Sequence, residues 1–330
     1  MEENQSDSLP ENTENQALPE NTTPPVLTRR PFEPKVQVVL MVLFGAILGG
    51  MLLGPMLFQL LATVFGWDTS AVTGGTFSAD AGGAERAQMR LFLGLSHFTT
   101  FILSGVFTVW LFYKGPAVNG MPHWADYLGV RRWPDAKTFG LAILLMLVSM
   151  PLVLFLYNVN KALPLPEVLR SLESDTNEAI KGLLNMENVG ELLANLLIIA
   201  LIPAIGEELL FRGLLQQQLM RRIANPLYAI LAAALIFSFI HFQFEGFLSR
   251  ALLGLLLGWM YWRTGNFWIP ALAHFFNNGL QVVGQYLYGQ ELSTIDLEQD
   301  IDIPWAAALV SAVLVWGIVQ IFPKKDAVAA

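Results

Sequence analysis

Long apolar segments alternate with short polar ones along the chain from Val36 onward. Several contain about 20 residues with few or no charges, which is the length that an α-helix needs to cross the hydrocarbon core of a bilayer. The pattern therefore predicts an all-α fold, a polytopic transmembrane helix bundle with about eight transmembrane helices. The candidate spans are 36–67, 91–113, 139–160, 189–211, 226–244, 247–262, 267–288 and 304–322.

The segment before the first apolar run has a different character. Residues 1–35 are rich in Glu, Asn, Thr and Pro and nearly lack large apolar side chains, so they cannot bury a core and are expected to be a disordered cytoplasmic tail. The first apolar run starts too late and continues too long for a cleaved signal peptide, so we expect it to remain as an anchor. The remaining chain is expected to form one transmembrane domain at 36–323 and a short C-terminal tail at 324–330.

Composition agrees with a membrane location. Hydrophobic residues make up 54% of the chain and charged residues 14%, whereas soluble globular proteins carry about 25% charged residues. The net charge of -8 comes largely from the tail and two acidic loops and is expected to serve solvation. No basic stripe suggests nucleic-acid binding, and the absence of Cys excludes disulfides and thiol chemistry.

The distribution of Lys and Arg predicts the orientation, because basic loops are retained in the cytoplasm. With eight crossings, most basic residues flank the same side as the N-terminal tail, and the acidic segments 166–182 and 291–302 fall on the other side. We therefore expect both termini to be cytoplasmic. The basic residues placed inside are Arg29, Arg30, Lys35, Lys114, Arg131, Arg132, Lys137, Arg221, Arg222, Arg263, Lys324 and Lys325.

Two adjacent carboxylates follow the fourth apolar run in "IPAIGEELLFRG". Glu208 and Arg212 are four residues apart on one helical face, in the order that favours an ion pair. Glu207 faces about 100° away and needs another partner, while Pro203 removes a backbone hydrogen bond and favours a kink. One interpretation is that these residues mark the aqueous end of the fourth span.

Two histidines in later spans favour a functional site instead. In "IFSFIHF", His241 follows Phe237 by four residues, and in "ALAHFFNNG", His274 precedes Asn278 by four, so each pair is expected to share one helical face. Ionisable residues inside a membrane are costly, face the bundle interior and usually belong to a functional site. Two histidines together with an acid pair on a third helix are difficult to explain by structure alone.

Other polar and small-residue features are expected to be structural. His97 in "GLSHFTT" has no comparable companion nearby, and His123 lies in a loop. Small residues spaced as GxxxG are expected to allow close helix packing within the bundle. The GxxxG pairs are Gly45/Gly49, Gly50/Gly54 and Gly254/Gly258.

Three short motifs resemble those of a known family. "EELLFR" is similar to an EExxxR motif, "FSFIH" to FxxxH and "HFFNN" to HxxxN, in the order found in the CPBP (ABI) family of intramembrane proteases, which includes the type II CAAX prenyl endopeptidases and related bacterial proteins. The resemblance covers residues 189–288, and no motif position departs from it. It implies a membrane endopeptidase with a membrane-associated or lipidated peptide or protein substrate, in the lipid bilayer of a bacterial plasma (inner) membrane.

The resemblance also implies catalytic roles. Glu207 and His241 would hold and deprotonate the attacking water, while His274 and Asn278 would donate hydrogen bonds to the oxyanion. Peptide hydrolysis needs both functions, together with a proton for the leaving amine. In this interpretation no cofactor is required.

The motifs also contain residues that could support the reacting groups or bind a metal ion. By resemblance, Glu208 and Arg212 would support the site from behind the reacting groups. An alternative uses Glu207, His241 and His274 as ligands of a catalytic zinc ion, which would leave an open position for water. The spacing differs from HExxH, in which both histidines and the base share one helix.

Functions of other classes are also compatible with buried ionisable residues. A transporter or channel could use the carboxylates and histidines as a proton or ion relay, although no inverted repeat is visible. A non-catalytic membrane factor could retain the fold for partner binding, although the motif residues are intact. The resemblance does not specify the substrate, which ranges from prenylated CAAX proteins to bacterial membrane peptides.

Overall fold

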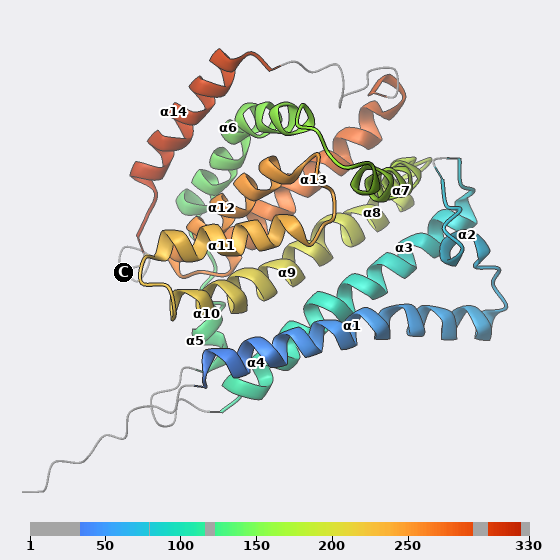
Figure 1. Cartoon of the computed structure of the whole chain (residues 1–330), viewed down its shortest axis with the longest axis horizontal. Coiled ribbons are helices and arrows are strands. Elements are labelled where there is room, and N and C mark those ends of the chain that lie inside the picture. Colours follow the sequence, from blue (N-terminus) through green and yellow to red (C-terminus); the bar gives the residue numbers. More distant parts are fainter. Residues whose placement is uncertain (1–33, 79, 116–122, 293–302, 325–330) are drawn as a thin grey trace, which may run out of the picture.

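The computed structural model describes residues 34–78, 80–115, 123–292 and 303–324, and these ranges form an all-helical bundle with no strand (Figure 1). Most of the expected N-terminal tail, nearly all of the expected C-terminal tail and the acidic segment 293–302 lie outside the described residues. The all-α prediction is confirmed for the part of the chain that the structure describes.

Apolar helices form at all eight predicted positions. Two of them are interrupted by short π-helical segments, labelled η, in which the backbone hydrogen bonds span one residue more than in an α-helix. The eight are α1 (Val36–Phe65), α3–η1–α4 (Gly83–His97, Phe98–Leu103, Ser104–Tyr113), α6 (Ala136–Lys161), α8–η3–α9–η4–α10 (Val189–Asn195, Leu196–Leu201, Ile202–Glu208, Leu209–Gln216, Gln217–Met220), α11 (Pro226–Phe239), α12 (Phe247–Thr264), α13 (Trp268–Leu292) and α14 (Trp305–Ile321).

The count of about eight membrane spans is not confirmed. Among the described residues, four helices are long and apolar enough to cross a membrane: Val36–Phe65, Gly83–Tyr113, Ala136–Lys161 and Val189–Met220. At 14 residues, α11 extends about 21 Å, less than the roughly 30 Å of a bilayer core. The helices α12 and α13 are not among those that are long and apolar enough to cross a membrane, and α13 carries the polar side chains of the third motif.

Basic residues near the ends of α10 and α12 contact the start of α1 and the end of α14. Arg221 at the end of α10 donates to the Pro34 carbonyl at 2.9 Å, beside the start of α1. Arg263 near the end of α12 donates to the carbonyl of Phe322 at 3.2 Å, just after α14. Gln217 at the start of α10 donates to the Tyr261 hydroxyl near the end of α12 at 2.8 Å, so the start of α1 and the end of α14 lie at the same end of the bundle. The cytoplasmic location of that end stays a prediction.

The second helix begins earlier than the predicted span 91–113, because α3 starts at Gly83 and includes Arg86 and Arg90. Both arginines are buried and pair with Glu191 of α8, at 3.1 and 3.2 Å. Asn195 accepts a further bond from Arg90 at 2.8 Å. This network fixes α3 beside α8 and satisfies two cations within the bundle.

The first acidic segment is a helix rather than a loop. The helix α7 (Glu167–Leu184) is bonded to the turn between α11 and α12 through Glu173, whose carboxylate accepts the backbone N–H groups of Phe244 and Glu245 at 2.9 and 3.1 Å. Burial raises the pKa of Glu173. Gln243 in the same turn donates to Asn177 of α7 at 3.1 Å, so α7 supports the segment that follows His241.

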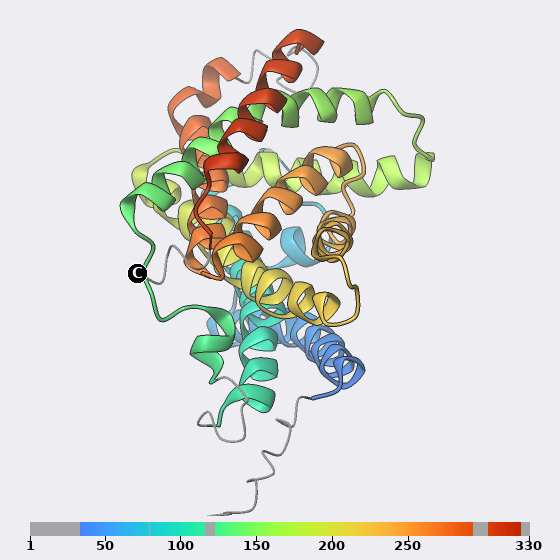
Figure 2. The same cartoon turned by 90° about the vertical axis from the view of Figure 1, so that its left-hand side faces the viewer.

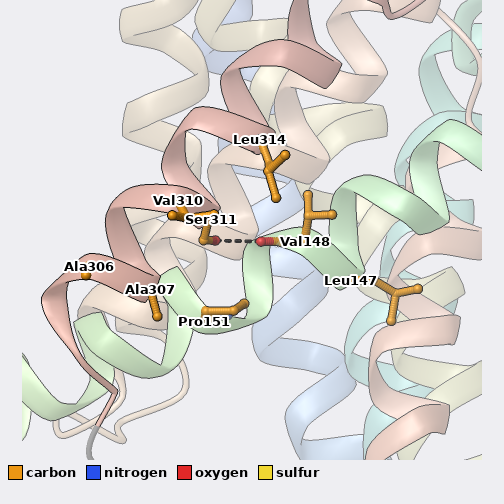
Figure 3. A pocket seen from close by; sticks show the side chains of 8 residues that line it. All are labelled: Leu147, Val148, Pro151, Ala306, Ala307, Val310, Ser311 and Leu314. Atoms are coloured by element: carbon orange, nitrogen blue, oxygen red, sulfur yellow. Dashed lines mark hydrogen bonds between the residues drawn. The ribbon is translucent and has the colours of Figure 1, made fainter.

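At the edge of the bundle, α14 lies across α6 (Figures 1 and 2). Pro151 interrupts α6, and the Ser311 hydroxyl of α14 donates to the Val148 carbonyl and accepts the N–H of Leu152, at 2.5 and 3.3 Å (Figure 3). Ser311 thereby bonds two backbone groups beside Pro151 and joins α14 to α6. The groove beside it has a volume of about 430 Å³, and none of the motif residues lines it.

Glycines permit close helix contacts, as two of the three GxxxG pairs predict. A Cβ on Gly50 would lie 2.3 Å from the Thr99 carbonyl oxygen, and one on Gly54 would lie 2.6 Å from Ser96 Cα, so α1 packs directly on α3 and η1. The Gly254/Gly258 pair likewise meets α11 and η4, whereas Gly45 and Gly49 meet no atom within 4 Å.

Candidate active site

The two carboxylates lie in the interior of a long helix. The predicted fourth span ended at residue 211, but the helix continues to Met220, so Glu207 and Glu208 are followed by three further turns. Their exposed fractions are 4% and 0%. They are therefore not solvent-exposed residues at a helix end, and their depth in the membrane stays a prediction. The segment α9 that carries them packs against α13 on one side and η1 and α3 on the other (Figure 1).

Glu208 and Arg212 form the predicted ion pair. Arg212 Nη1 lies 2.8 Å from Glu208 Oε1, and both side chains are fully buried. The other guanidinium nitrogen, Nη2, donates to the Gly254 carbonyl at 3.0 Å, and the group lies 4.8 Å from the centre of the Phe237 ring. Arg212 is thus compensated by charge, hydrogen bond and π-face, as a buried guanidinium requires.

His274 on α13 connects the two carboxylates. Its Nδ1 lies 2.9 Å from Glu208 Oε1, and since an ionised carboxylate can only accept, Nδ1 carries the hydrogen and donates it. Its Nε2 lies 3.9 Å from Glu207 Oε2. The second carboxylate oxygen of Glu208, Oε2, has no hydrogen-bond partner among the described residues. The Glu208–His274 bond fixes the ring so that Nε2 is available toward Glu207.

The prediction that His241 lies within a helical span is wrong. His241 lies in the turn that follows α11, which ends at Phe239. The next residue, Phe242, has a φ of 51°, a left-handed conformation that is unusual for a bulky residue and that ends the helix. His241 Nδ1 lies 2.7 Å from the Phe237 carbonyl and must donate to it, so the neutral ring has a bare Nε2. The imidazole is close enough to Glu207 for an electrostatic interaction.

Asn278 is held by a backbone carbonyl of η3. Asn278 Nδ2 donates to the Ile199 carbonyl at 3.3 Å, and Asn277 donates to Asn278 Oδ1 at 3.2 Å. One amide hydrogen of Asn278 is left for another acceptor. These bonds join α13 to η3 at the third motif.

The structure adds a residue for which we expected only a structural role. His97 Nε2 on α3 lies 3.6 Å from Glu207 Oε1, and the ring stacks on Phe101 with centroids 5.2 Å apart. The only sequence signal was a further histidine inside an apolar span, because its companion lies 110 positions later in the chain. The expectation holds for His123, whose ring nitrogen accepts the Ala125 N–H at 3.3 Å and begins α5 (Trp124–Leu128).

The arrangement does not fit a metal site as placed. Within the described ranges, no three His, Asp or Glu side chains form a group that could hold a metal ion, and this includes the alternative ligand set Glu207, His241 and His274.

Helices long and apolar enough to cross a bilayer, with buried carboxylates and imidazoles between them, define an integral membrane protein with a buried polar site. Residues 189–280 match the family model described as type II CAAX prenyl endopeptidase Rce1-like, which confirms the resemblance inferred from the three motifs.

One relative matches over a shorter stretch. An uncharacterized protein, YpbD of Bacillus subtilis (strain 168), is 33% identical over 87 residues, which amount to 25% of this chain and 41% of that protein. No solved structure matches the chain. His97 lies outside the 189–280 segment that matches the family.

Proposed function

We propose that this protein is a membrane endopeptidase that hydrolyses a peptide bond with water activated by Glu207 and His241. The observation that carries the proposal is the division between the two carboxylates: Glu208 receives the Arg212 guanidinium at 2.8 Å, whereas the ion-pair contacts of Glu207 are with imidazoles. A buried carboxylate without a guanidinium partner is available as a base.

Water activation uses Glu207 and His241, both of which can accept a proton. The Glu207 carboxylate takes one hydrogen of the water, and the bare Nε2 of His241 accepts the other as a hydrogen bond, which orients the oxygen lone pair. The Phe237 carbonyl keeps His241 in this tautomer through the 2.7 Å bond at Nδ1. The water oxygen bonds to the substrate carbonyl carbon as its proton moves to Glu207.

The oxyanion is stabilised from α13. A protonated His274 donates through Nε2 while Nδ1 remains bonded to Glu208, and Asn278 donates its remaining amide hydrogen. With His274 protonated, two cations balance the two buried carboxylates, because Arg212 supplies the other positive charge. Collapse of the intermediate breaks the C–N bond, and Glu207 transfers its proton to the leaving amine.

The substrate proposal follows from the family and the depth of the site. The matched family acts on CAAX prenyl substrates by its description, and the site lies between helices that are long enough to cross a bilayer. We therefore propose a membrane-associated peptide or protein with a prenyl or similar lipid as substrate. We also propose a bacterial plasma membrane location with both termini in the cytoplasm.

A zinc-dependent reaction is the second candidate. It draws support from both histidines, each of which donates from Nδ1 to a carbonyl or carboxylate and has Nε2 available, an arrangement typical of metal-binding histidines. We prefer the metal-free reaction because the ligands do not converge. The family match does not favour the ion-transport interpretation.

The proposal is tested with purified protein in liposomes and two membrane-anchored peptides of one sequence, with and without a farnesyl group. We expect cleavage at one internal peptide bond, faster for the farnesylated peptide, and retained in protein shown by elemental analysis to be metal-free. Equal rates on both peptides would contradict the lipid preference. If removal of a stoichiometric bound metal abolished cleavage and added zinc restored it, the zinc-dependent reaction would replace the metal-free one.

A further inference from the structure

His97 lies on α3, in a part of the chain that the family match does not cover, yet its imidazole faces the buried Glu207. Its Nε2 is 3.6 Å from Oε1, while the Nε2 of His274 is 3.9 Å from Oε2. Each oxygen of the carboxylate therefore faces a different imidazole. Only one of these two imidazoles belongs to the three motifs.

Glycine contacts on two sides of α3 and η1 maintain this placement. Gly206 directly precedes Glu207, and a Cβ there would lie 2.8 Å from Phe101 Cβ, so only glycine allows η1 to approach α9 this closely. Phe101 is one turn after His97 and stacks on its ring. On the other side, Gly54 of α1 allows contact with Ser96, the neighbour of His97. The backbone thus presents His97 to Glu207.

We propose that His97 is a positioning residue for catalysis, which fixes the orientation of the Glu207 carboxylate so that its proton-accepting oxygen faces the attacking water. The role rests on the proposed function of Glu207 as the base. A distance of 3.6 Å is slightly longer than a hydrogen bond, and catalytic hydrogen bonds in unliganded enzymes often shorten when substrate binds.

A purely structural role for His97 would mean that its removal lowers the stability of the fold. The side chain is 32% exposed, unlike the fully buried Glu208 and Arg212, so its removal leaves no buried charge without a partner. Loss of His97 should therefore affect turnover more than folding. A misoriented catalytic group can reduce rates by roughly 10²-fold with little effect on substrate binding.

The kinetic test compares His97→Leu with His97→Gln, whose amide places an N–H near the position of Nε2. We expect His97→Leu to lower kcat by roughly 10²-fold with KM nearly unchanged, and His97→Gln to recover most of the loss. The unfolding temperature in detergent should be unchanged in both. A His97→Leu enzyme with normal kcat, or a loss of kcat that follows a loss of folded protein and is not recovered by Gln, would overturn the proposal.

A spectroscopic test does not depend on turnover. The chain has four histidines, so ¹⁵N-histidine NMR in detergent can assign the His97 ring nitrogens by their loss in His97→Gln. We expect Glu207→Gln to shift the His97 resonances and to leave those of His123 unchanged. An unshifted His97 signal would reject the contact, whereas a shifted signal in a protein without peptidase activity would reject only the proposed function.

Discussion

Glu207 and Glu208 are neighbours in sequence, but of the two only Glu208 pairs with Arg212. The helical rotation between them directs Glu208 to Arg212 and Glu207 to His97, and His274 lies between the two carboxylates. The spacing of Glu208 and Arg212 predicts their ion pair, and the structure confirms it. Spacing cannot predict the partners of Glu207, because they lie on other helices far away in the chain.

The two acids should respond differently to the same substitution. Glu208→Gln leaves the buried Arg212 without its counter-charge, and breaking a buried pair costs about 3 to 5 kcal/mol, so the unfolding temperature should fall together with activity. Glu207→Gln is the matched control and should unfold near the normal temperature. Equal destabilisation by both substitutions, measured by thermal unfolding in detergent, would show that Glu207 is also structural.

Asn278 should be needed for turnover more than for binding. Asn278→Ala removes an oxyanion donor, and we expect kcat to fall by about 10²- to 10³-fold with a small change in KM. Asn277→Ala is the comparison, because it removes the side chain that donates to Asn278 Oδ1 but leaves the amide hydrogens of Asn278 in place. Steady-state kinetics on both variants measure the difference, and an equal loss of kcat in Asn277→Ala would contradict an oxyanion contact specific to Asn278.

At the scale of elements, the hydrophobic pattern locates every apolar helix, but not where each ends. The fourth span continues to Met220, where Gln216 and Gln217 donate to α12, to the Gly258 carbonyl and the Tyr261 hydroxyl. The end of α11 before His241 depends on the left-handed Phe242, which has no sequence signal of its own. Tertiary contacts, rather than local pattern, determine these ends.

The start of α6 depends on a capping side chain. Asp135 accepts the Thr138 N–H and hydroxyl, at 2.9 and 2.6 Å, and these bonds lower the pKa of Asp135. Asp135→Ala should cost about 1 kcal/mol at neutral pH. Because the folded-state pKa is the lower one, this contribution is present above the unfolded value of about 4 and is lost as the pH falls through the folded value.

Unfolding by denaturant between pH 3 and 7 measures this dependence. The cost of Asp135→Ala should shrink toward acid pH. Asp135→Asn keeps a neutral cap, so the free energy of unfolding that it costs should vary less with pH than the cost of Asp135→Ala. A cost of Asp135→Ala that is constant over this range would mean that the ionised carboxylate is not what caps α6.

At the scale of the whole molecule, the order of the three motifs was the most informative sequence feature, since it indicated the family and brought Glu207, His241, His274 and Asn278 together as candidates. His97 could not be recognised in this way, because packing of η1 on Gly206 brings it to the site. The number of spans also depends on tertiary structure, since short or polar helices such as α11 and α13 are accommodated among longer ones.

The topology gives a prediction for the complete chain. Reporter fusions at Met1 and Ala330 should be cytoplasmic, and an insertion in α7 should be external, as the basic residues imply. The Arg221 and Arg263 contacts agree with a shared end for α1 and α14. A reporter inserted in α7 that is found on the cytoplasmic side would contradict this topology.

The most direct measurement compares cleavage of a membrane-anchored peptide by the purified protein and by Glu207→Gln, in liposomes at matched folded concentration. We predict internal peptide-bond cleavage by the unmodified protein and a loss of nearly all turnover in Glu207→Gln, whose amide cannot accept the proton of the attacking water. Near-normal turnover in the folded Glu207→Gln protein would contradict the assignment of Glu207 as the base of a membrane endopeptidase.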